Sequence, residues 1–204
     1  MIDDTKTLIF AKAPEAGRTK TRLIPTLGAD GAAALHKQLI RHAVTTARAA
    51  ELGPVELWCA SAVAHPLFVE LAASESLTLR EQTAGDLGVR MHAALEDALA
   101  THRYVLLIGT DCPGYSVKYL HAARNGLMSG NDAVIGPAAD GGYVLIGLRQ
   151  NDASLFRGID WGKGGVAEAT RERLRRLGWQ FGELKTLRDI DRPEDVTDAD
   201  LALI

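Results

Sequence analysis

The chain has 204 residues and a mass of 21.9 kDa, with 47% hydrophobic and 24% charged residues. This composition is ordinary for a globular protein, and the length suits a single domain over residues 1–204. The formal net charge of −3 argues against a general nucleic-acid-binding protein. No apolar stretch reaches the roughly 18 residues of a membrane span, and the acidic N-terminus lacks the layout of a secretory signal. We therefore expect a cytoplasmic protein with neither a nucleic-acid nor a membrane partner.

Apolar runs and segments with helical spacing alternate through the first half of the chain. Asp30 is expected to cap a long helix, in which apolar residues recur at helical spacing until Gly53 and Pro54 end it. Leu87, Met91, Leu95 and Leu99 define a second amphipathic helix. In order, the predicted elements are strand 7–11, helix 30–52, strand 55–60, helix 66–73, strand 77–81, helix 87–101 and strand 104–108.

The second half continues this alternation with one exception. A helix is predicted at 117–127, strands at 133–135 and 143–148, a basic helix at 166–177 and a last strand at 180–184. Only residues 136–142 separate two of these strands, which leaves no room for a crossover helix, so an antiparallel or irregular connection is expected there. Elsewhere the alternation predicts an α/β fold with parallel strand pairing.

A basic loop follows the first predicted strand, with the sequence KAPEAGRTKTRL. It carries Lys12, Arg18, Lys20 and Arg22 around the flexible Gly17. Glycine permits close backbone approach to an anion, and these cations supply the countercharge of a polyphosphate. The loop fits neither G-x-x-x-x-G-K-[ST] nor G-x-G-x-x-G. A phosphate-binding loop is therefore one interpretation, and a solvated basic turn is the other.

The turn GTDCPG follows the most apolar strand and contains Asp111. Ligands of open α/β sheets bind outside the carboxyl ends of the strands. An aspartate at this position is suited to a divalent cation that bridges phosphates, because Mg²⁺ combines one or two carboxylates with phosphate oxygens. The alternative is a helix cap before Pro113.

Three further segments each allow a functional and a structural interpretation. Asp140 lies in the glycine-rich run 136–143 and is a candidate for a metal, a sugar hydroxyl or an acceptor, or else part of a tight turn. Asp86, in the segment QTAGDLGVRM, stands at a helix N-terminus that would present free N–H groups, or is an ordinary cap. Asp189 and Asp191 precede a helix start at Pro193 and are candidates to face a metal.

The remaining reactive side chains are not arranged in a recognisable motif. Cys59 and Cys112 are too far apart for a zinc motif, and two cysteines make no disulfide framework. The six histidines form no H-x-x-x-H pair, so a zinc site is not expected. No pattern supplies a base for Cys112 as a nucleophile.

Taken together, six ordered segments resemble the bacterial DUF2064 proteins, also described as glycosyltransferase-A-type or selenodomain-associated transferases. That family is related to guanylyltransferases of cofactor biosynthesis, including the molybdenum-cofactor enzymes. The resemblance covers residues 7–195, nearly the whole chain. It rests on KAPEAGRTKTRL, QTAGDLGVRM, GTDCPG, GPAADGGYVLIGLR, LFRGIDW and DIDRPED.

The resemblance implies a Rossmann-like nucleotide-diphospho-sugar transferase (GT-A) fold, with a mostly parallel central sheet flanked by helices. It further implies Mg²⁺ or Mn²⁺ at Asp111, with Asp189 or Asp191 as a second acidic ligand. By the same resemblance, the nucleotide phosphates would be held by Lys12, Gly17, Lys20 and Arg22. The base or ribose would lie near Gln82, Gly85 and Asp86. The acceptor side would be formed by Asp140, Gly141 and Gly142.

The expected function is metal-dependent transfer from an activated nucleotide to a small-molecule acceptor. In glycosyl transfer from a nucleotide-sugar, Asp111, Lys20 and Arg22 would stabilise the leaving nucleoside diphosphate. Nucleotidyl transfer with release of pyrophosphate is the alternative, and a non-catalytic nucleotide-binding module is a third. Trp161-Gly162-Lys163 stands where relatives commonly have Trp-Ser-Thr, and this departure leaves the acceptor and the activity open. The base, sugar, acceptor and oligomeric state stay open.

Overall fold

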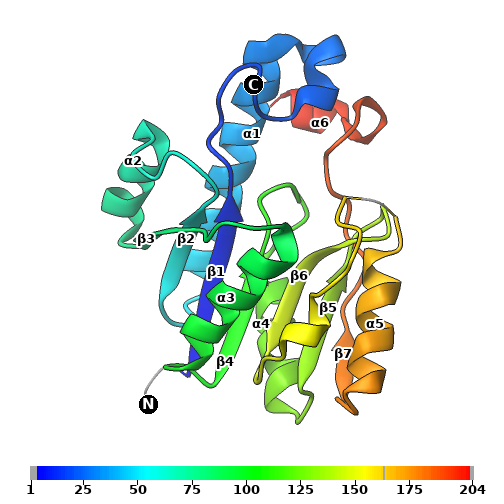
Figure 1. The fold of residues 1–204 in the computed structure, drawn as a ribbon. Helices are drawn as coiled ribbons and strands as arrows, with labels where there is room; N and C mark the ends of the chain where they lie inside the picture. Colours follow the sequence, from blue (N-terminus) through cyan, green and yellow to red (C-terminus); the bar gives the residue numbers. More distant parts are fainter. Residues whose placement is uncertain (1–3, 163, 203–204) are drawn as a thin grey trace.

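A seven-stranded mixed sheet forms the centre of the computed structural model, which describes residues 4–162 and 164–202 (Figure 1). The strand order is β3-β2-β1-β4-β6-β5-β7. The strands are β1 (Thr5–Ala11), β2 (Val55–Cys59), β3 (Thr78–Glu81), β4 (Tyr104–Ile108), β5 (Ala133–Pro137), β6 (Tyr143–Leu148) and β7 (Phe181–Glu183).

Every neighbouring pair of strands is parallel except the two pairs that include β6. The antiparallel pair of β5 and β6, with Ala133 opposite Leu148 and Ile135 opposite Ile146, confirms the prediction for the short 136–142 connection. The other connections contain helices, as parallel pairing requires. The α/β class and the mostly parallel sheet are therefore confirmed.

Helices cover both faces of the sheet (Figure 1). One face is covered by α1, α2 and α4, and the other by α3 and α5. Within the described part of the chain, no helix is long and apolar enough to cross a membrane. The helices are α1 (Ile24–Ala49), α2 (Pro66–Glu75), α3 (Leu87–Leu99), α4 (Val117–Met128), α5 (Val166–Arg176) and α6 (Asp198–Leu201), with the 3-10 turns η1 (Thr21–Leu23), η2 (Ala153–Leu155) and η3 (Pro193–Asp195).

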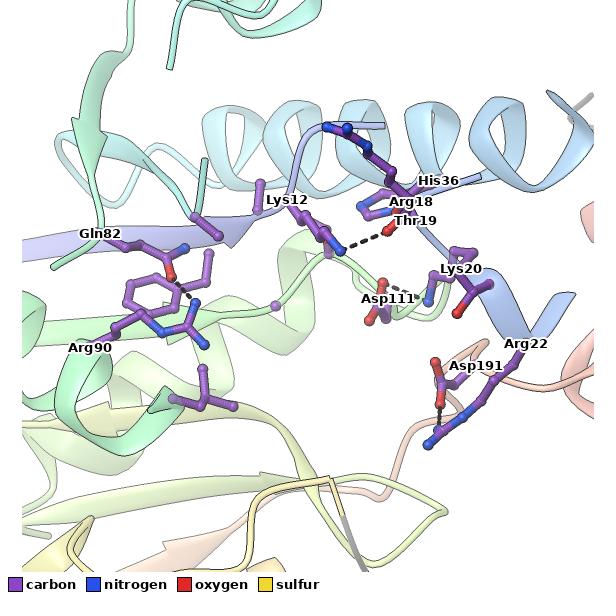
Figure 2. A pocket seen from close by; sticks show the side chains of 17 residues that line it. Lys12, Arg18, Thr19, Lys20, Arg22, His36, Gln82, Arg90, Asp111 and Asp191 are labelled. Atoms are coloured by element: carbon purple, nitrogen blue, oxygen red, sulfur yellow. Dashed lines mark hydrogen bonds and ion pairs between the residues drawn. The ribbon is translucent and has the colours of Figure 1, made fainter. Parts of the chain in front are cut away.

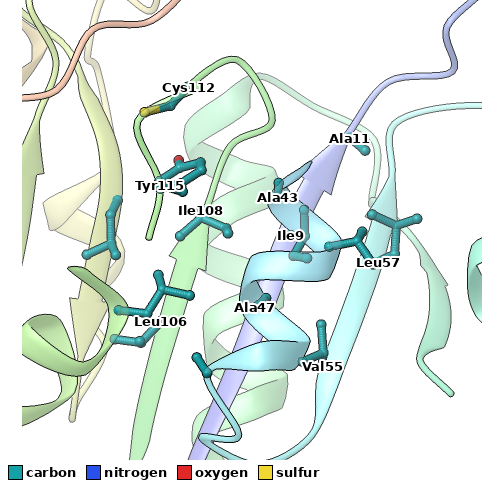
Figure 3. Packing of buried hydrophobic residues seen from close by; sticks show 14 of the residues in the cluster. Ile9, Ala11, Ala43, Ala47, Val55, Leu57, Leu106, Ile108, Cys112 and Tyr115 are labelled. Carbon is teal, nitrogen blue, oxygen red and sulfur yellow. The ribbon is translucent and has the colours of Figure 1, made fainter. Parts of the chain in front are cut away.

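The central strand β1 is buried on both faces, and its side chains alternate between two cores. Ile9 and Ala11 pack against α1 and its neighbours (Figure 3), whereas Leu8 and Phe10 belong to the core beneath α3 and α5. This alternation follows from the two-residue period of a strand. It holds β1 rigidly, so the loop that leaves its carboxyl end starts from a fixed point.

α1 begins at Ile24, six residues before the predicted cap at Asp30, although its long regular part starts only after Gly28, close to the predicted position. The helix is broken at Gly28, whose φ of 70° and ψ of 170° are not helical. Its first turn is stabilised by tertiary packing: Leu23, Leu35, Leu39 and the distant Ile190 form a separate buried cluster. No local sequence pattern predicts this contact with Ile190.

The segment after β7 crosses the carboxyl ends of the sheet. Leu187 forms an isolated parallel bridge with Ala138, and Ile190 N donates to Asp111 O at 2.8 Å. Instead of the expected helix start, Pro193 opens a 3-10 turn. These contacts bring Asp189 and Asp191 to the edge where β1 and β4 end.

Candidate functional site

A cavity of about 500 Å³ opens at the carboxyl ends of β1 and β4 (Figure 2). Its volume falls within the range of small-molecule sites. It lies where the predicted basic loop, the turn after β4 and the C-terminal segment meet. The polar side chains that line it are Lys12, Arg18, Thr19, Lys20, Thr21, Arg22, His36, Gln82, Arg90, Thr110, Asp111 and Asp191.

The basic loop is held in a defined conformation. Arg18 N and Thr19 N both donate to Glu15 O at 3.1 Å, and Lys12 Nζ donates to Arg18 O at 2.7 Å (Figure 2). Lys20 has a φ of 47°, in the left-handed region that a lysine seldom adopts. Such backbone conformations persist where the surroundings impose them, often at functional sites.

Lys20 and Asp111 form the ion pair that joins this loop to the turn after β4. Lys20 Nζ lies 2.7 Å from Asp111 Oδ1, and the lysine side chain is 3% exposed whereas the aspartate side chain is 49% exposed. Lys20 Nζ also donates to Ile190 O. The ammonium of Lys20 therefore has one hydrogen-bonded partner, Ile190 O, and one ion-pair partner, Asp111.

Arg22 pairs with Asp191 across 169 residues of chain. Both side chains are substantially exposed, at 57% and 40%. Asp195 Oδ2 accepts hydrogen bonds from Asp191 N at 3.0 Å and from Arg192 N at 2.7 Å. The C-terminal acids are thus partly structural, and Asp191 is the one that lines the cavity.

His36 and Thr19 form a buried hydrogen-bonded pair that the sequence analysis did not identify. His36 is 4% exposed, and its Nε2 has no hydrogen-bond partner. Burial lowers the pKa of His36 to about 4, and the nearby Lys20 and Lys12 act in the same direction against Asp111. The imidazole is therefore neutral near pH 7. Its position between Leu35 and Leu39 gives it the appearance of a core residue in the sequence.

Gln82 and Arg90 lie at the end of the cavity away from Lys20 (Figure 2). Gln82 Nε2 donates to Trp58 O at 2.7 Å, and Arg90 Nη1 donates to Gln82 Oε1 at 3.1 Å. Gln82 was a predicted site residue, whereas Arg90 was not. The available signal was its position in QTAGDLGVRM, one turn after Asp86.

Seven predicted site residues do not line this cavity, namely Gly17, Gly85, Asp86, Asp140, Gly141, Gly142 and Asp189. Asp86 is the N-cap of α3 and accepts from Val89 N at 2.9 Å, which is the structural alternative for that residue. Gly85 precedes it with a φ of 122°. Gly17 has a φ of 77° within the basic loop, where it shapes the turn.

Asp140, Gly141 and Gly142 form the turn between β5 and β6. Asp140 Oδ1 accepts from Gly142 N at 2.7 Å, and Gly141, with a φ of 90°, donates its N–H to Ala138 O. The tight-turn interpretation therefore describes their backbone. Of the three, Asp140 also lines a second cavity of about 380 Å³, which we call the acidic recess.

The acidic recess adjoins the first cavity, because Arg22 and Asp191 line both. Its other acidic residues are Asp189, Asp195 and Asp140. Burial raises the pKa of Asp189, and the charges of Asp140, Asp195 and Asp111 raise it further. The C-terminal acids are thus near enough to Asp111 to interact electrostatically.

A third, apolar recess of about 180 Å³ adjoins the other two. Phe10 and Leu87 line both this recess and the first cavity, and Asp140 borders both this recess and the acidic one. Tyr143 and Trp161 meet edge to face in its wall, with ring centroids 6.5 Å apart. Gly162 also lines it, whereas Lys163 lies outside the described residues.

The residues present fit a divalent cation only if phosphate or water supplies most ligands. Among the residues that the structure describes, no three His, Cys, Asp or Glu side chains form a metal-holding group. Asp111 Oδ1 is buried without a hydrogen bond, its contact with Lys20 being an ion pair by distance. Half of that side chain is exposed, so a carboxylate oxygen is available to a cation, and Mg²⁺ often takes one carboxylate plus phosphate and water.

Cys112 follows Asp111 directly but does not take part in this chemistry. It is fully buried, and burial raises the pKa of its thiol to about 11. The thiol is therefore protonated near neutral pH, and only the thiolate is nucleophilic.

Three solved structures with the same fold have names that refer to a nucleotide or to a group derived from one. A Desulfovibrio desulfuricans G20 protein with the provisional name nucleotide-diphospho-sugar transferase is 30% identical, with a TM-score of 0.86 over 100% of this chain and 94% of that one. The 4-diphosphocytidyl-2C-methyl-D-erythritol synthase of Anaerococcus prevotii is 11% identical, with a TM-score of 0.60 over 98% and 97%.

A third structure is glucosyl-3-phosphoglycerate synthase of Mycobacterium tuberculosis in complex with Mn²⁺, UDP and glucosyl-3-phosphoglycerate. It is 10% identical, with a TM-score of 0.57 over 97% of this chain and 76% of that one. At such identities the second and third likenesses establish the fold alone. No curated protein matches the chain in sequence.

The family assignment rests on sequence. The model of the family described as "Uncharacterized protein conserved in bacteria (DUF2064)" matches residues 40–163, more than half of the chain. The matched region contains the turn with Asp111 and the segment with Gln82. The chain belongs to the DUF2064 family and has the fold of the nucleotide-diphospho-sugar transferases.

Proposed function

We propose that this protein is a transferase that uses an activated nucleotide, and that it transfers a glycosyl group from a nucleotide-sugar. The observation that carries this proposal is the joining of the basic loop to Asp111 in one cavity, through the Lys20–Asp111 pair. The provisional name of the 30% identical relative supports the same chemistry.

The cations would stabilise the charge that develops on a leaving nucleoside diphosphate. Arg18 and Arg22 have exposed side chains, at 78% and 57%, and could exchange their present partners, Glu15 and Asp191, for phosphate oxygens. Lys12 is also exposed. Lys20, being buried, would act through its positive charge and by orienting Asp111. Fixed cations at a developing negative charge accelerate a reaction because they need little reorganisation.

Asp111 would hold the metal ion, with Asp191 or Asp189 nearby as a second acid. When bound, Mg²⁺ or Mn²⁺ would supply Lewis-acid stabilisation of the leaving diphosphate. The chain's own contribution is to position the carboxylate, through the hydrogen bond from Ile190 N to Asp111 O and the ion pair with Lys20.

The acceptor would enter beside the nucleotide, from the apolar and acidic recesses. In the transfer, an acceptor hydroxyl oxygen bonds to the anomeric carbon, the bond from that carbon to the diphosphate oxygen breaks, and the hydroxyl proton is released. Asp140 borders both recesses and is the carboxylate we assign to receive that proton.

Nucleotidyl transfer is the second candidate, and the number of cations favours it. Lys12, Arg18, Lys20 and Arg22 line a single cavity, and a triphosphate needs more countercharge than a diphosphate. In that reaction an acceptor oxygen bonds to the α-phosphorus and pyrophosphate leaves.

A thermal-shift screen against NTPs, NDPs and NDP-sugars, each with Mn²⁺, Mg²⁺ or EDTA, tests the proposal. A ligand at 100 times its Kd adds about 2.7 kcal/mol of stability, or roughly 5–10 °C for a chain of this size. We expect the largest metal-dependent shift with an NDP-sugar; a larger shift with one NTP, together with pyrophosphate release, would favour the second candidate. No shift with any nucleotide would overturn both.

Asp111→Asn should abolish the metal dependence of that shift and most turnover. Asp30→Asn, which changes an exposed carboxylate outside the cavity on α1, is the matched control and should behave as the wild type. Unchanged turnover in Asp111→Asn would contradict the mechanism. Nucleotide binding without turnover against a broad panel of acceptors would support a non-catalytic module instead.

A further inference from the structure

We propose that Arg90 recognises the base of the nucleotide and selects bases that carry an exocyclic carbonyl oxygen over adenine, the common base that has none. This inference rests on the proposed function, since it specifies which nucleotides the same cavity accepts. It concerns a residue to which the sequence analysis assigned no role.

The cavity has two chemically different ends. Lys20 and Asp111 lie at one end, Gln82 and Arg90 lie at the other, and Lys12 lies between them (Figure 2). Two apolar residues of the cavity lining lie near this second end in the chain: Leu87 is one turn before Arg90 on α3, and Ala60 follows Cys59, whose carbonyl accepts from Gln82 N at 2.9 Å. Phe10 lies beside Trp58, with ring centroids 6.3 Å apart, and it is Trp58 O that accepts from Gln82. A nucleotide with its phosphates among the cations would therefore extend its base toward Gln82 and Arg90.

Gln82 is fixed in one orientation by its two partners. Its Nε2 donates to Trp58 O at 2.7 Å and its Oε1 accepts from Arg90 Nη1 at 3.1 Å. A carbonyl oxygen only accepts and a guanidinium only donates, so the amide cannot be reversed without losing both bonds. Gln82 is 9% exposed. It acts as a positioning residue for Arg90.

Arg90 has a second anchor at the start of α3, where its Nε donates to Asp86 O at 3.3 Å. Two points of attachment hold the planar guanidinium in a defined orientation while its remaining N–H groups can serve a ligand. Those groups are donors only. Whatever binds there must present acceptor atoms, and two acceptors side by side suit the guanidinium best.

This requirement separates the bases. Guanine presents O6 and N7, two neighbouring acceptors that arginine binds in a bidentate manner. Thymine and uracil present O4. Adenine presents N7 beside an N6 amino group, so an arginine donor would face another donor. An unpaired donor in a partly enclosed site is unfavourable, which gives discrimination against adenine.

Hypoxanthine provides the sharpest comparison, because IDP differs from ADP only by O6 in place of the amino group and by the resulting N1 proton. We would measure the Kd of IDP, GDP, UDP, ADP and inorganic pyrophosphate by titration calorimetry with the full chain and Mn²⁺. We expect IDP to bind at least about tenfold more tightly than ADP, because one good arginine contact to a base changes the Kd by about this factor.

The variant Arg90→Gln should reduce the ratio of the ADP and IDP Kd values to within about twofold and leave the Kd of pyrophosphate unchanged. Arg80→Gln is the matched control, since Arg80 pairs with Asp97 at 2.7 Å outside the cavity; it should keep the wild-type ratio. Arg90→Lys, which keeps a donor-only cation but loses the planar fork, should weaken the discrimination less than Arg90→Gln does.

Three results would overturn the proposal. Equal Kd values for IDP and ADP in the wild type would do so without any variant, even if Arg90→Gln failed to fold. Weakened pyrophosphate binding in Arg90→Gln would assign Arg90 to the phosphates instead. Retention of the wild-type ratio in folded Arg90→Gln would place recognition elsewhere. Absence of binding by every nucleotide would overturn the proposed function as well, whereas tight but equal binding would overturn the base selection alone.

Discussion

Lys20 Nζ lies 2.7 Å from Asp111 Oδ1, so a buried ammonium from the loop after β1 meets a half-exposed carboxylate from the turn after β4. The pair is asymmetric: the lysine depends on the aspartate for its countercharge, whereas the aspartate still reaches the cavity. One contact therefore connects the stability of the loop to the orientation of the proposed metal ligand.

A double-mutant cycle should detect this dependence. Asp111→Ala leaves the Lys20 ammonium buried without a countercharge and should lower the free energy of unfolding by about 2–3 kcal/mol. In a Lys20→Met background the same change should cost about 1–2 kcal/mol less. Urea denaturation of the four proteins gives these values. The exposed pair Arg41–Glu70, at 2.8 Å, is the control cycle, with an expected coupling of at most about 1 kcal/mol; additive effects at Lys20 and Asp111 would contradict the prediction.

His36 should make the protein less stable as the pH falls below 6.5. Its pKa is lowered by burial to about 4 in the folded protein, whereas the unfolded chain has the ordinary value near 6.5. Above pH 6.5 both states are neutral. Between pH 6.5 and 4 only the unfolded state gains the proton, so the free energy of unfolding should fall by up to about 3 kcal/mol.

The variant His36→Gln isolates this contribution, because glutamine can still bond to Thr19 but does not titrate. Urea unfolding of both proteins at pH 7.0, 6.0 and 5.0 should show a smaller loss in the variant. His102, whose pKa is also lowered chiefly by burial, titrates in both proteins and cancels in the difference. Parallel curves for the two proteins would show that His36 does not carry the effect.

Gly88 should not tolerate a side chain, although it lies in a helix where alanine is intrinsically preferred. A Cβ there would lie 2.6 Å from Phe156 O and 2.9 Å from atoms of Trp161. A backbone carbonyl cannot easily move, so Gly88→Ala should cost about 1–3 kcal/mol, or several degrees in Tm. Gly109→Ala, with nothing within 4 Å of the added carbon, should leave the Tm nearly unchanged in the same melting experiment.

Strands were predictable where burial dominates, since β4 and β6 have the bounds that their apolar runs indicate. The start of α1 was not predictable, because the helix begins in a cluster with Ile190, more than 160 residues away. Asp86 shows a related difficulty: a local cap and a ligand-binding residue have the same sequence pattern, and only its bond to Val89 N shows the capping role.

The candidate site, like the fold, could be predicted from the sequence only in part. Lys12, Lys20, Arg22 and Asp111, which the loop and strand-end arguments proposed as site residues, line one cavity, and their roles stay predictions. Their ion pairing could not be read from the sequence, because it depends on which side of the sheet edge each loop crosses. In the sequence, Arg90 has the pattern of an exposed cation on a helix, and only its hydrogen bond to Gln82 in the structure indicates a role in the cavity.

Exposed cations of the basic loop should govern phosphate affinity in a salt-dependent manner. Arg18 is 78% exposed and pairs with Glu15 at 3.2 Å, so it is available to a ligand and subject to screening. Arg18→Ala should weaken the binding of pyrophosphate about three- to tenfold at 50 mM NaCl and by less at 500 mM. Titration calorimetry at the two salt concentrations measures both effects.

Lys118→Ala is the control for this experiment, since Lys118 is an exposed cation on α4 that does not line the cavity. It removes the same unit of charge from the whole molecule, so any effect of net charge alone should appear in both variants. A specific role for the loop requires a clear difference between them. Equal Kd values and equal salt dependence for Arg18→Ala and Lys118→Ala would remove Arg18 from the phosphate site.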